Sequence, residues 1–295
     1  MTEDHQKEDS LTLGIIGGSG LYSMPGLQDT QELILGTPFG DPSSPIVVGT
    51  LEGVQVAFLA RHGIGHHISP SEVNYRANIY ALKSLGVERV LSITATGSLR
   101  EDFEPGDIVI PDQLFDFTKG RKRSYFEGGL VAHISVADPF CKDWSKSVYQ
   151  AVAATDATVR RGGSMITIEG PRFSTRIESN TFRSWGIALI GMTAAPEAFL
   201  ALEAELCYAA LAHVTDYDVW HRSEEPVTAE MVFKILEGNT KIAEQSVLNL
   251  IRNLPAERDC DCENTLAAAL STQPSAINPA ALERLGLLVD KYLGD

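Results

Sequence analysis

The sequence is poor in cysteine, in basic residues and in long apolar runs. Four cysteines among 295 residues are too few for a disulfide scaffold. Only 24 lysines and arginines stand against 39 acidic residues, which gives a formal net charge of −15. Because a protein that neutralises a nucleic-acid backbone needs clustered lysine and arginine, we expect no nucleic-acid partner and favour a small anionic or neutral ligand.

No apolar run approaches the about 18 residues that would indicate a membrane span, so we expect no membrane partner. The first ten residues, MTEDHQKEDS, are acidic and polar, and they lack the basic and apolar segments of a secretory signal. We therefore expect a cytoplasmic protein.

The composition, with 44% hydrophobic and 21% charged residues, is typical of a globular chain. We expect a disordered tail over residues 1–12 and a single domain over 13–295, in which 255–295 form a C-terminal extension that packs on the domain or on a neighbouring subunit.

The spacing of the cysteines predicts no metal site. Cys260 and Cys262 form a C-x-C pair, which lacks the two C-x-x-C halves of a structural zinc site. Cys141 and Cys207 stand alone in the sequence. We expect buried or redox-inert thiols. A disulfide within the C-x-C pair would be sterically tight, and the sequence leaves open whether any of the four cysteines pair.

Short apolar runs alternate with segments of helical periodicity. The segment Val73–Leu85 has apolar residues spaced for a helix, with Ser71 as N-cap and Gly86 at its end. Further helices are expected over 196–207, 229–250 and 279–292, and strands over 13–16, 46–48, 54–60, 90–95, 107–111 and 187–190. The alternation predicts an α/β fold with a mixed, mostly parallel twisted sheet flanked by helices, in which ligand sites lie where strands end.

A glycine loop follows the first expected strand. Gly17-Gly18-Ser19-Gly20 could present backbone N–H groups and a hydroxyl to a phosphate. A dinucleotide-binding loop is the rival interpretation, but Met24-Pro25-Gly26 follows where that motif requires a helix. Taken alone, the loop does not distinguish a phosphate site from a structural turn.

Two further strand ends carry groups that bind oxyanions. Arg61 offers a planar fork and His62 a second donor. The nearby His66 and His67 invite a zinc interpretation, but their spacing does not match a zinc-binding helix. The segment Ser92–Ser98 adds hydroxyls and glycine N–H groups. Three such strand ends in an acidic protein favour one fixed inorganic anion.

A pair of carboxylates, Asp216 and Asp218, follows another apolar run. Residues at i and i+2 of a strand point the same way, so the pair could bind the amino edge and a ring nitrogen of a purine and move a proton. A solvated strand end is the alternative. The functional interpretation of the pair is supported by two other polar segments of the chain, Thr167–Ser174 and Gly191–Thr193.

These residues carry a resemblance to a known family. The segments GIIGGSGL, TPFGDPS, ARHG, TATGSLRE, TIEGPRFSTRIES, GMTAAPEAFLALEAELCYA and VTDYDVW resemble the trimeric purine nucleoside phosphorylase family over about residues 13–250. The resemblance implies a nucleoside phosphorylase-like fold and phosphate contacts from Ser19, Arg61, His62, Thr94, Ala95 and Thr193. It also implies that Met192 lies against the ribose, Phe173 against the base or sugar, and Asp216 and Asp218, as catalytic residues, at N7 and the 6-amino edge.

Specificity follows from three positions of this resemblance. Family branches that cleave 6-oxopurines have glutamate and asparagine where this chain has Ser174 and Asp216, and a histidine where it has Ala229. The chain is therefore similar to the branch that cleaves 5′-methylthioadenosine with inorganic phosphate, a transferase of purine and methionine salvage that needs no cofactor. Since Ala229 is small, adenosine is a further candidate substrate.

The resemblance further implies a homotrimer or a dimer of trimers, in which His133 reaches into a neighbour's 5′ pocket. Two alternatives stay open. One is a phosphorylase of ordinary nucleosides or of methylthioinosine, and the other is a nucleoside-binding protein that does not react with its ligand.

Overall fold

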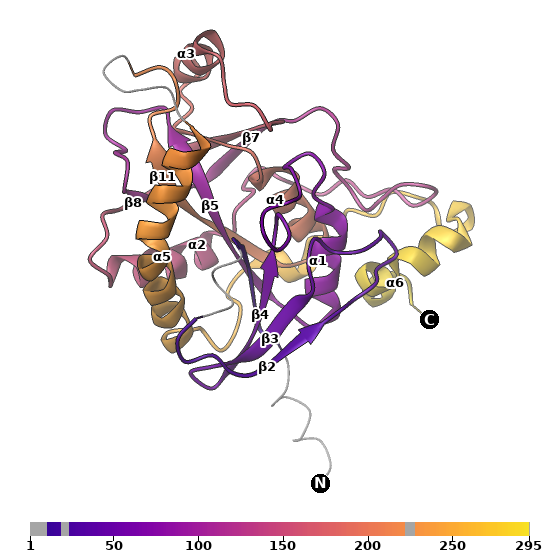
Figure 1. Cartoon of the computed structure of the whole chain (residues 1–295). Coiled ribbons are helices and arrows are strands. Elements are labelled where there is room, and N and C mark those ends of the chain that lie inside the picture. Colours follow the sequence, from indigo (N-terminus) through magenta and orange to yellow (C-terminus); the bar gives the residue numbers. More distant parts are fainter. Residues whose placement is uncertain (1–10, 19–23, 222–227, 295) are drawn as a thin grey trace.

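The computed structural model describes residues 11–18, 24–221 and 228–294 (Figure 1). Within them the chain forms one eleven-stranded sheet, in which six of ten strand pairs are parallel. This confirms the expected mixed, mostly parallel α/β fold. The strands are β1 (Leu13–Gly17), β2 (Gln28–Leu33), β3 (Ile46–Leu51), β4 (Val54–Ala60), β5 (Arg89–Ser98), β6 (Ile108–Ile110), β7 (Gln113–Phe117), β8 (Val159–Arg161), β9 (Ser164–Ile168), β10 (Leu189–Gly191) and β11 (Cys207–Asp216).

Helices cover both faces of the sheet. They are α1 (Tyr75–Ser84), α2 (Lys142–Ala153), α3 (Arg176–Ser184), α4 (Ala194–Glu203), α5 (Ala229–Arg252) and α6 (Pro279–Leu293). Helices α2 and α5 share one hydrophobic cluster with β1, β5 and β11, while α1, α4 and α6 share another (Figure 1). Both β1 and β11 are buried along their whole length, as expected for central strands with helices on each side.

The central strand β5 changes partners along one edge. Its first residues, Arg89–Ser92, pair with β1, whereas Gly97 and Ser98 pair with the antiparallel strand β10. On the other edge, β11 runs parallel to it throughout. Residues 93–96 therefore have neither β1 nor β10 beside them, and the sheet opens there. The polar end of β5 is thus available to a ligand.

Helix α1 begins later than the sequence predicted. Its N-cap is Asn74, whose side-chain oxygen accepts a hydrogen bond from the Ala77 N–H. Ser71, the expected N-cap, instead donates its hydroxyl to the Glu169 carbonyl. The expected end is confirmed, because Gly86 adopts φ +83°, a left-handed conformation that glycine tolerates.

The helix expected over 196–207 is wrong at both ends. It starts at Ala194 and ends at Glu203, and Cys207 already belongs to β11. Glu205 adopts φ +57°, which breaks the helix so that the chain can turn into the sheet. Its carboxylate accepts hydrogen bonds from the Leu266 N–H and the Tyr292 hydroxyl, so the turn also holds the C-terminal segment.

The C-terminal extension packs on its own domain. It contains two short 3₁₀ turns, η2 (Asp261–Asn264) and η3 (Pro274–Ala276), followed by α6. Leu285 and Val289 of α6 are fully buried in the same cluster as α1 and α4. At the other end of the chain, Leu11 is also buried. Residues 1–10 of the expected tail lie outside the described residues. In the described part of the chain, no helix is both long and apolar enough to span a membrane.

Candidate active site

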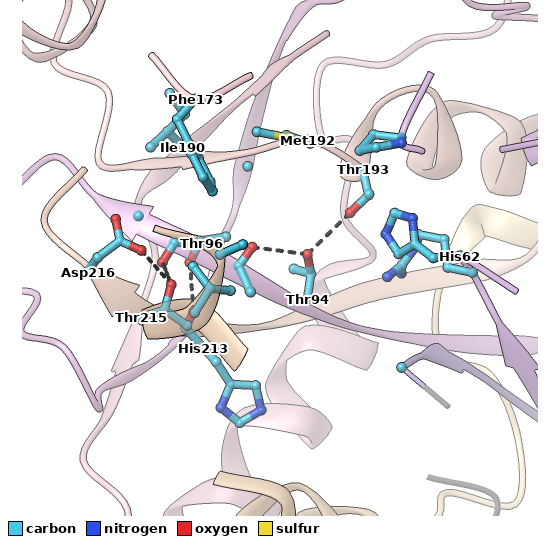
Figure 2. A pocket seen from close by; sticks show the side chains of 18 of the residues that line it. His62, Thr94, Thr96, Phe173, Ile190, Met192, Thr193, His213, Thr215 and Asp216 are labelled. Atoms are coloured by element: carbon cyan, nitrogen blue, oxygen red, sulfur yellow. Dashed lines mark hydrogen bonds between the residues drawn. The ribbon is translucent and has the colours of Figure 1, made fainter. Parts of the chain in front are cut away.

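A cavity of about 640 Å³ lies at the opening beside β5. The ends of β5, β10 and β11 meet there (Figure 2). Helix α5 also lines the cavity, from Ala229 in its first turn to Ala243. Most of the site residues predicted from the sequence line it: Arg61, His62, Thr94, Ala95, Phe173, Ser174, Met192, Thr193, Asp216, Asp218 and Ala229. Ser19 lies outside the described residues, but the adjacent Gly18 lines the cavity.

One end of the cavity carries hydroxyl groups and an imidazole. The hydroxyl oxygens of Thr94 and Thr193 lie 3.2 Å apart, and the His62 ring lies at the same end (Figure 2). Nδ1 of His62 is 2.9 Å from the Ile68 carbonyl, which requires a proton on Nδ1, so Nε2 is the atom left for a ligand.

Burial, together with the nearby positive charge of Arg61, lowers the pKa of His62 to about 4. The imidazole is therefore neutral at pH 7 when no anion is bound. A bound phosphate dianion would favour the charged form, so His62 can take up a proton as the anion binds. His66, whose ring stacks on His62 with centroids 4.4 Å apart, also lines the cavity and was not assigned a role from the sequence.

The guanidinium of Arg61 does not present two N–H groups to the cavity, as the sequence predicted. Its Nε and Nη2 atoms donate to the two carboxylate oxygens of Glu197 at 2.8 and 2.9 Å. Nη2 also donates to the Ser92 hydroxyl and Nη1 to the Ile93 carbonyl. Of the five N–H groups of a guanidinium, one on Nη1 remains for an anion. The bidentate partner is an internal carboxylate rather than the ligand.

Glu197 was not predicted from the sequence, and it is completely buried. Besides Arg61, the hydroxyls of Ser92 and Tyr208 donate to its Oε1 atom at 2.9 and 2.8 Å. Burial alone would lower the pKa of Arg61, but the charge and hydrogen bonds of Glu197 raise it above its usual value. The pair thus fixes a permanently charged arginine at the anion end of the cavity. The sequence did not distinguish it, because the segment predicted as a helix over 196–207 also holds Glu203 and Glu205.

The opposite end of the cavity carries the two predicted carboxylates. Burial raises the pKa of Asp216 to about 6, although the Thr215 hydroxyl and the Asp218 N–H both donate to it and act in the other direction. Burial also raises the pKa of Asp218. Oδ2 of Asp218 and the hydroxyls of Ser174 and Ser179 are buried, and none of them makes a hydrogen bond of normal geometry among the described residues. The two hydroxyls lie near the Asp218 carboxylate and act to lower its pKa against the effect of burial, so the three groups form one polar cluster that can bind polar atoms of a ligand.

Strand periodicity does not explain why the carboxylates lie together. β11 has an irregularity between Val214 and Asp216, and Asp218 lies beyond the strand at φ +51°. The Asp218 N–H donates to Oδ1 of Asp216 at 2.7 Å, which closes a tight turn. Gly97 on β5 makes room, because a Cβ atom there would lie 2.9 Å from the same oxygen.

The described lining of this cavity does not include His133. That residue is exposed on a segment whose backbone contacts the C-terminal extension, where its N–H donates to the Ala269 carbonyl at 2.9 Å. Among the described residues, no group of metal-ligating side chains gathers in the cavity, since His62, His66 and His67 are not part of one. The one such group found in the described part of the chain consists of the four cysteines, which lie elsewhere in the fold.

Comparisons with known proteins identify the family of the chain. Residues 12–252 match the family model described as the phosphorylase superfamily. The S-methyl-5′-thioadenosine phosphorylases of Geobacter sulfurreducens and Chloroflexus aurantiacus are 49% and 50% identical over 282 and 284 residues, covering 95% and 96% of this chain and 99% of each relative.

Solved structures show the same similarity. A methylthioadenosine phosphorylase from an antarctic soil metagenomic library superimposes with a TM-score of 0.90 at 43% identity, covering 95% of this chain and 99% of that one. The methylthioadenosine phosphorylase of Schistosoma mansoni in complex with adenine gives a TM-score of 0.79 at 36% identity, covering 88% and 97%.

Proposed function

Because the chain belongs to the phosphorylase superfamily, we propose that it is an S-methyl-5′-thioadenosine phosphorylase. It transfers the 5-methylthioribosyl group of 5′-methylthioadenosine to inorganic phosphate, giving adenine and 5-methylthioribose 1-phosphate. This proposal rests mainly on the difference between the two ends of the cavity. One end carries hydroxyl groups and an imidazole that can bind an anion, and the other carries two buried carboxylates. Such a reaction serves purine and methionine salvage.

The anion end binds the phosphate nucleophile. Thr94 and Thr193 offer hydroxyls, Arg61 its free N–H, and His62 its Nε2 atom, which is protonated when the dianion is present. The backbone of Ala95 and the hydroxyl of Ser19 complete this set. These groups hold the phosphate beside C1′ of the ribose, where it stabilises the positive charge that develops as the glycosidic bond breaks.

The carboxylate end binds and protonates the base. As the C1′–N9 bond breaks, its electron pair moves into the purine, and Asp216 donates a proton to N7. A phosphate oxygen then forms the new bond to C1′. Oδ2 of Asp218, a buried acceptor, accepts from the 6-amino group. A 6-oxopurine would place an oxygen there instead, so the site favours adenine.

The thioether end of the substrate lies toward Ala229, and Met192 lies against the ribose. Both line the cavity, and the methyl side chain of Ala229 cannot hydrogen-bond a 5′-hydroxyl as histidine does. Burial of the methylthio group contributes on the order of 1 kcal/mol. Phe173, which is 37% exposed, packs over the sugar or the base.

The test is release of the free base with and without inorganic phosphate: adenine from 5′-methylthioadenosine and adenosine, and hypoxanthine from inosine and methylthioinosine. Phosphate-dependent release with methylthioadenosine preferred is the expected result. Release from inosine would mean that Ser174 and Asp216 do not select adenine. Tight binding of methylthioadenosine without release would identify a nucleoside-binding protein instead.

Replacing Ala229 with histidine is expected to move the preference toward adenosine. The imidazole would fill space used by the methylthio group and offer a hydrogen bond to the ribose 5′-hydroxyl. The ratio of kcat/KM for adenosine to that for methylthioadenosine should rise by roughly tenfold or more. Glu230→Gln, at a neighbouring exposed position outside the described cavity lining, is the control and should leave the ratio unchanged. An unchanged ratio in Ala229→His would place the 5′ group elsewhere.

We also propose a homotrimer, alone or paired into a dimer of trimers. Exposed aromatic rings support it: Phe115, Phe117 and Trp185 are 43%, 38% and 52% exposed and lie in mutual contact beside α3. An apolar patch of this kind marks an interface. The exposed His133 is available to a neighbouring subunit, where it reaches the 5′ pocket.

Light scattering coupled to size exclusion should give three or six times the chain mass. Trp185→Asp should reduce the assembly, and His133→Ala should raise KM for methylthioadenosine while the assembly persists. A fully active monomer would exclude this arrangement.

The proposed reaction uses phosphate as a second substrate and no cofactor. The four free cysteines suit a reducing compartment such as the cytoplasm.

A further inference from the structure

Four cysteines from three separate parts of the chain gather at one point. Cys141 precedes α2, Cys207 begins β11, and Cys260 and Cys262 lie in the C-terminal extension. Their four sulfur atoms all lie within 4.8 Å of one another. These are all the cysteines of the chain, and the described lining of the active-site cavity includes none of them.

The backbone fixes this arrangement. The Cys141 N–H donates to the carbonyl of Tyr208, the residue after Cys207, at 2.9 Å. Cys207 is also held by its own N–H, which donates to the Glu88 carbonyl at 3.0 Å. The turn η2 positions the other two cysteines, because it starts directly after Cys260 and includes Cys262. The sulfur of Cys260 lies 3.3 Å from that of Cys207.

The distances fit four ligands around one ion. In a tetrahedral zinc site with Zn–S bonds of about 2.3 Å, neighbouring sulfurs lie about 3.8 Å apart. The separations here, 3.3 Å for Cys207–Cys260 and at most 4.8 Å for any pair, lie on either side of that value. Every sulfur is near all the others, whereas two independent disulfides would need only two close pairs.

The surroundings suit a thiolate site. Cys141 and Cys207 are only 5% and 2% exposed, and all four cysteines adjoin the hydrophobic cluster beneath α2 and α5. Cys141 is the N-cap of α2, a position where the helix dipole favours a thiolate. Four thiolates around a divalent ion leave excess negative charge, and the Arg258 guanidinium lies beside the Cys207 sulfur to offset it.

We propose that Cys141, Cys207, Cys260 and Cys262 bind one zinc ion in a closed, structural site. Tetrathiolate coordination is typical of zinc, and four protein ligands leave no position for substrate. The ion would join the start of β11 and the start of α2 to the C-terminal extension, and so hold residues 255–270 on the domain. The inference concerns stability, and it stands whether or not the proposed reaction is correct.

The proposal revises the expectation drawn from spacing. Cys260 and Cys262 are separated by one residue, and the other two cysteines lie 53 and 119 residues before Cys260, so no zinc motif can be seen in the sequence. The four cysteines come together only in the fold, because β11 pairs with β5 and the C-terminal extension packs back against the start of β11.

The test is the metal content of the full-length protein, purified without a metal-affinity tag, without chelator and under anaerobic conditions. Elemental analysis is expected to give about one zinc per chain. Exchange with cobalt should produce the visible absorption of a tetrahedral thiolate complex. Cys262→Ser should lower the bound zinc at least about tenfold and reduce the Tm, whereas Asp261→Asn, which changes no thiol, should keep both values.

Thiol counting supplies a second readout that does not depend on the variants. In denaturant without reductant, the zinc-bound protein should show four titratable thiols after addition of chelator. No thiols and no metal would mean two disulfides, and four thiols with no metal would mean a thiol cluster alone. Either result, or iron in place of zinc, would overturn the proposal. Adenine release is measured separately, so loss of the proposed enzymatic function would not affect this conclusion.

Discussion

Asp216→Ala is expected to lower kcat for 5′-methylthioadenosine by about 10² to 10⁴-fold, the range typical of a lost general acid. The proton on N7 is needed mainly in the transition state, when the electron pair of the glycosidic bond enters the purine. KM should therefore change much less than kcat. Steady-state kinetics at saturating phosphate measures both. A kcat close to that of the unsubstituted enzyme would remove Asp216 from the chemistry.

The pH dependence tests the same assignment. Because burial raises the pKa of Asp216 to about 6, the protonated form that can donate is lost as pH rises through 6. The kcat/KM of the enzyme should fall on the alkaline side of this value. Asp216→Asn, which has no proton to lose, should lack this limb. Phosphate itself titrates in the same range and affects both proteins, so the ratio of the two profiles isolates the contribution of Asp216.

The Asp216→Asn substitution should stabilise the fold at neutral pH even though it removes the proton donor. The folded protein binds the proton on Asp216 more tightly than the unfolded chain, whose aspartate pKa is near 3.8. Its contribution is favourable below pH 4 and is lost between about 4 and 6, so at pH 7.5 the buried carboxylate destabilises the fold. The difference in pKa corresponds to on the order of 2–3 kcal/mol. Asp216→Asn is therefore expected to have a higher Tm at pH 7.5 and a smaller advantage at pH 5. A lower Tm at both pH values would contradict this account.

The sequence predicted which strand ends carry the site because polar residues follow buried apolar runs there. Thr94, Thr193 and Asp216 all line one cavity, since the ends of β5 and its neighbours meet at the place where β5 changes partners. Periodicity cannot show that change of partners. It depends on the pairing of β5 with β1 and β10, which are far apart in the chain.

The details of the site depended on tertiary contacts. The sequence placed Asp218 by strand alternation, but a left-handed turn beyond an irregular β11 brings it to Asp216. Helix α4 ends earlier than predicted because Glu205 leaves the helical conformation, and its carboxylate accepts a hydrogen bond from the C-terminal extension. Arg61 was predicted as a free anion receptor because its partner, Glu197, lies 136 residues away. No local pattern indicates an ion pair at such a distance.

That buried pair leads to the largest stability change we expect. Glu197→Gln leaves the charge of Arg61 buried without its counter-ion, and the loss of one partner of such a pair destabilises by about 3–5 kcal/mol. Arg61 would also lose the two bonds that orient it. Glu197 is thus a positioning residue, and its loss should raise KM for phosphate more than KM for methylthioadenosine.

Glu203→Gln is the matched control. Glu203 lies on the same helix and is 5% exposed, and its carboxylate accepts from the Ser124 hydroxyl and the Tyr125 N–H rather than from a guanidinium. Burial raises its pKa to about 7, so a neutral amide should be tolerated far better there. Thermal unfolding and separate KM values for the two substrates measure the difference. Equal losses in the two variants would mean that Glu197 acts only through core packing.

A double substitution separates structure from function. Arg61→Met alone buries the Glu197 carboxylate unpaired, and Glu197→Met alone buries the guanidinium unpaired, so each single variant should be strongly destabilised. Removing both charges together leaves apolar side chains of similar volume, which often restores stability. The double variant should therefore unfold at a higher temperature than either single variant, yet show almost no phosphate-dependent turnover, because the fixed positive charge at the anion end is gone. Recovered activity in the double variant would show that Arg61 is not needed to bind phosphate.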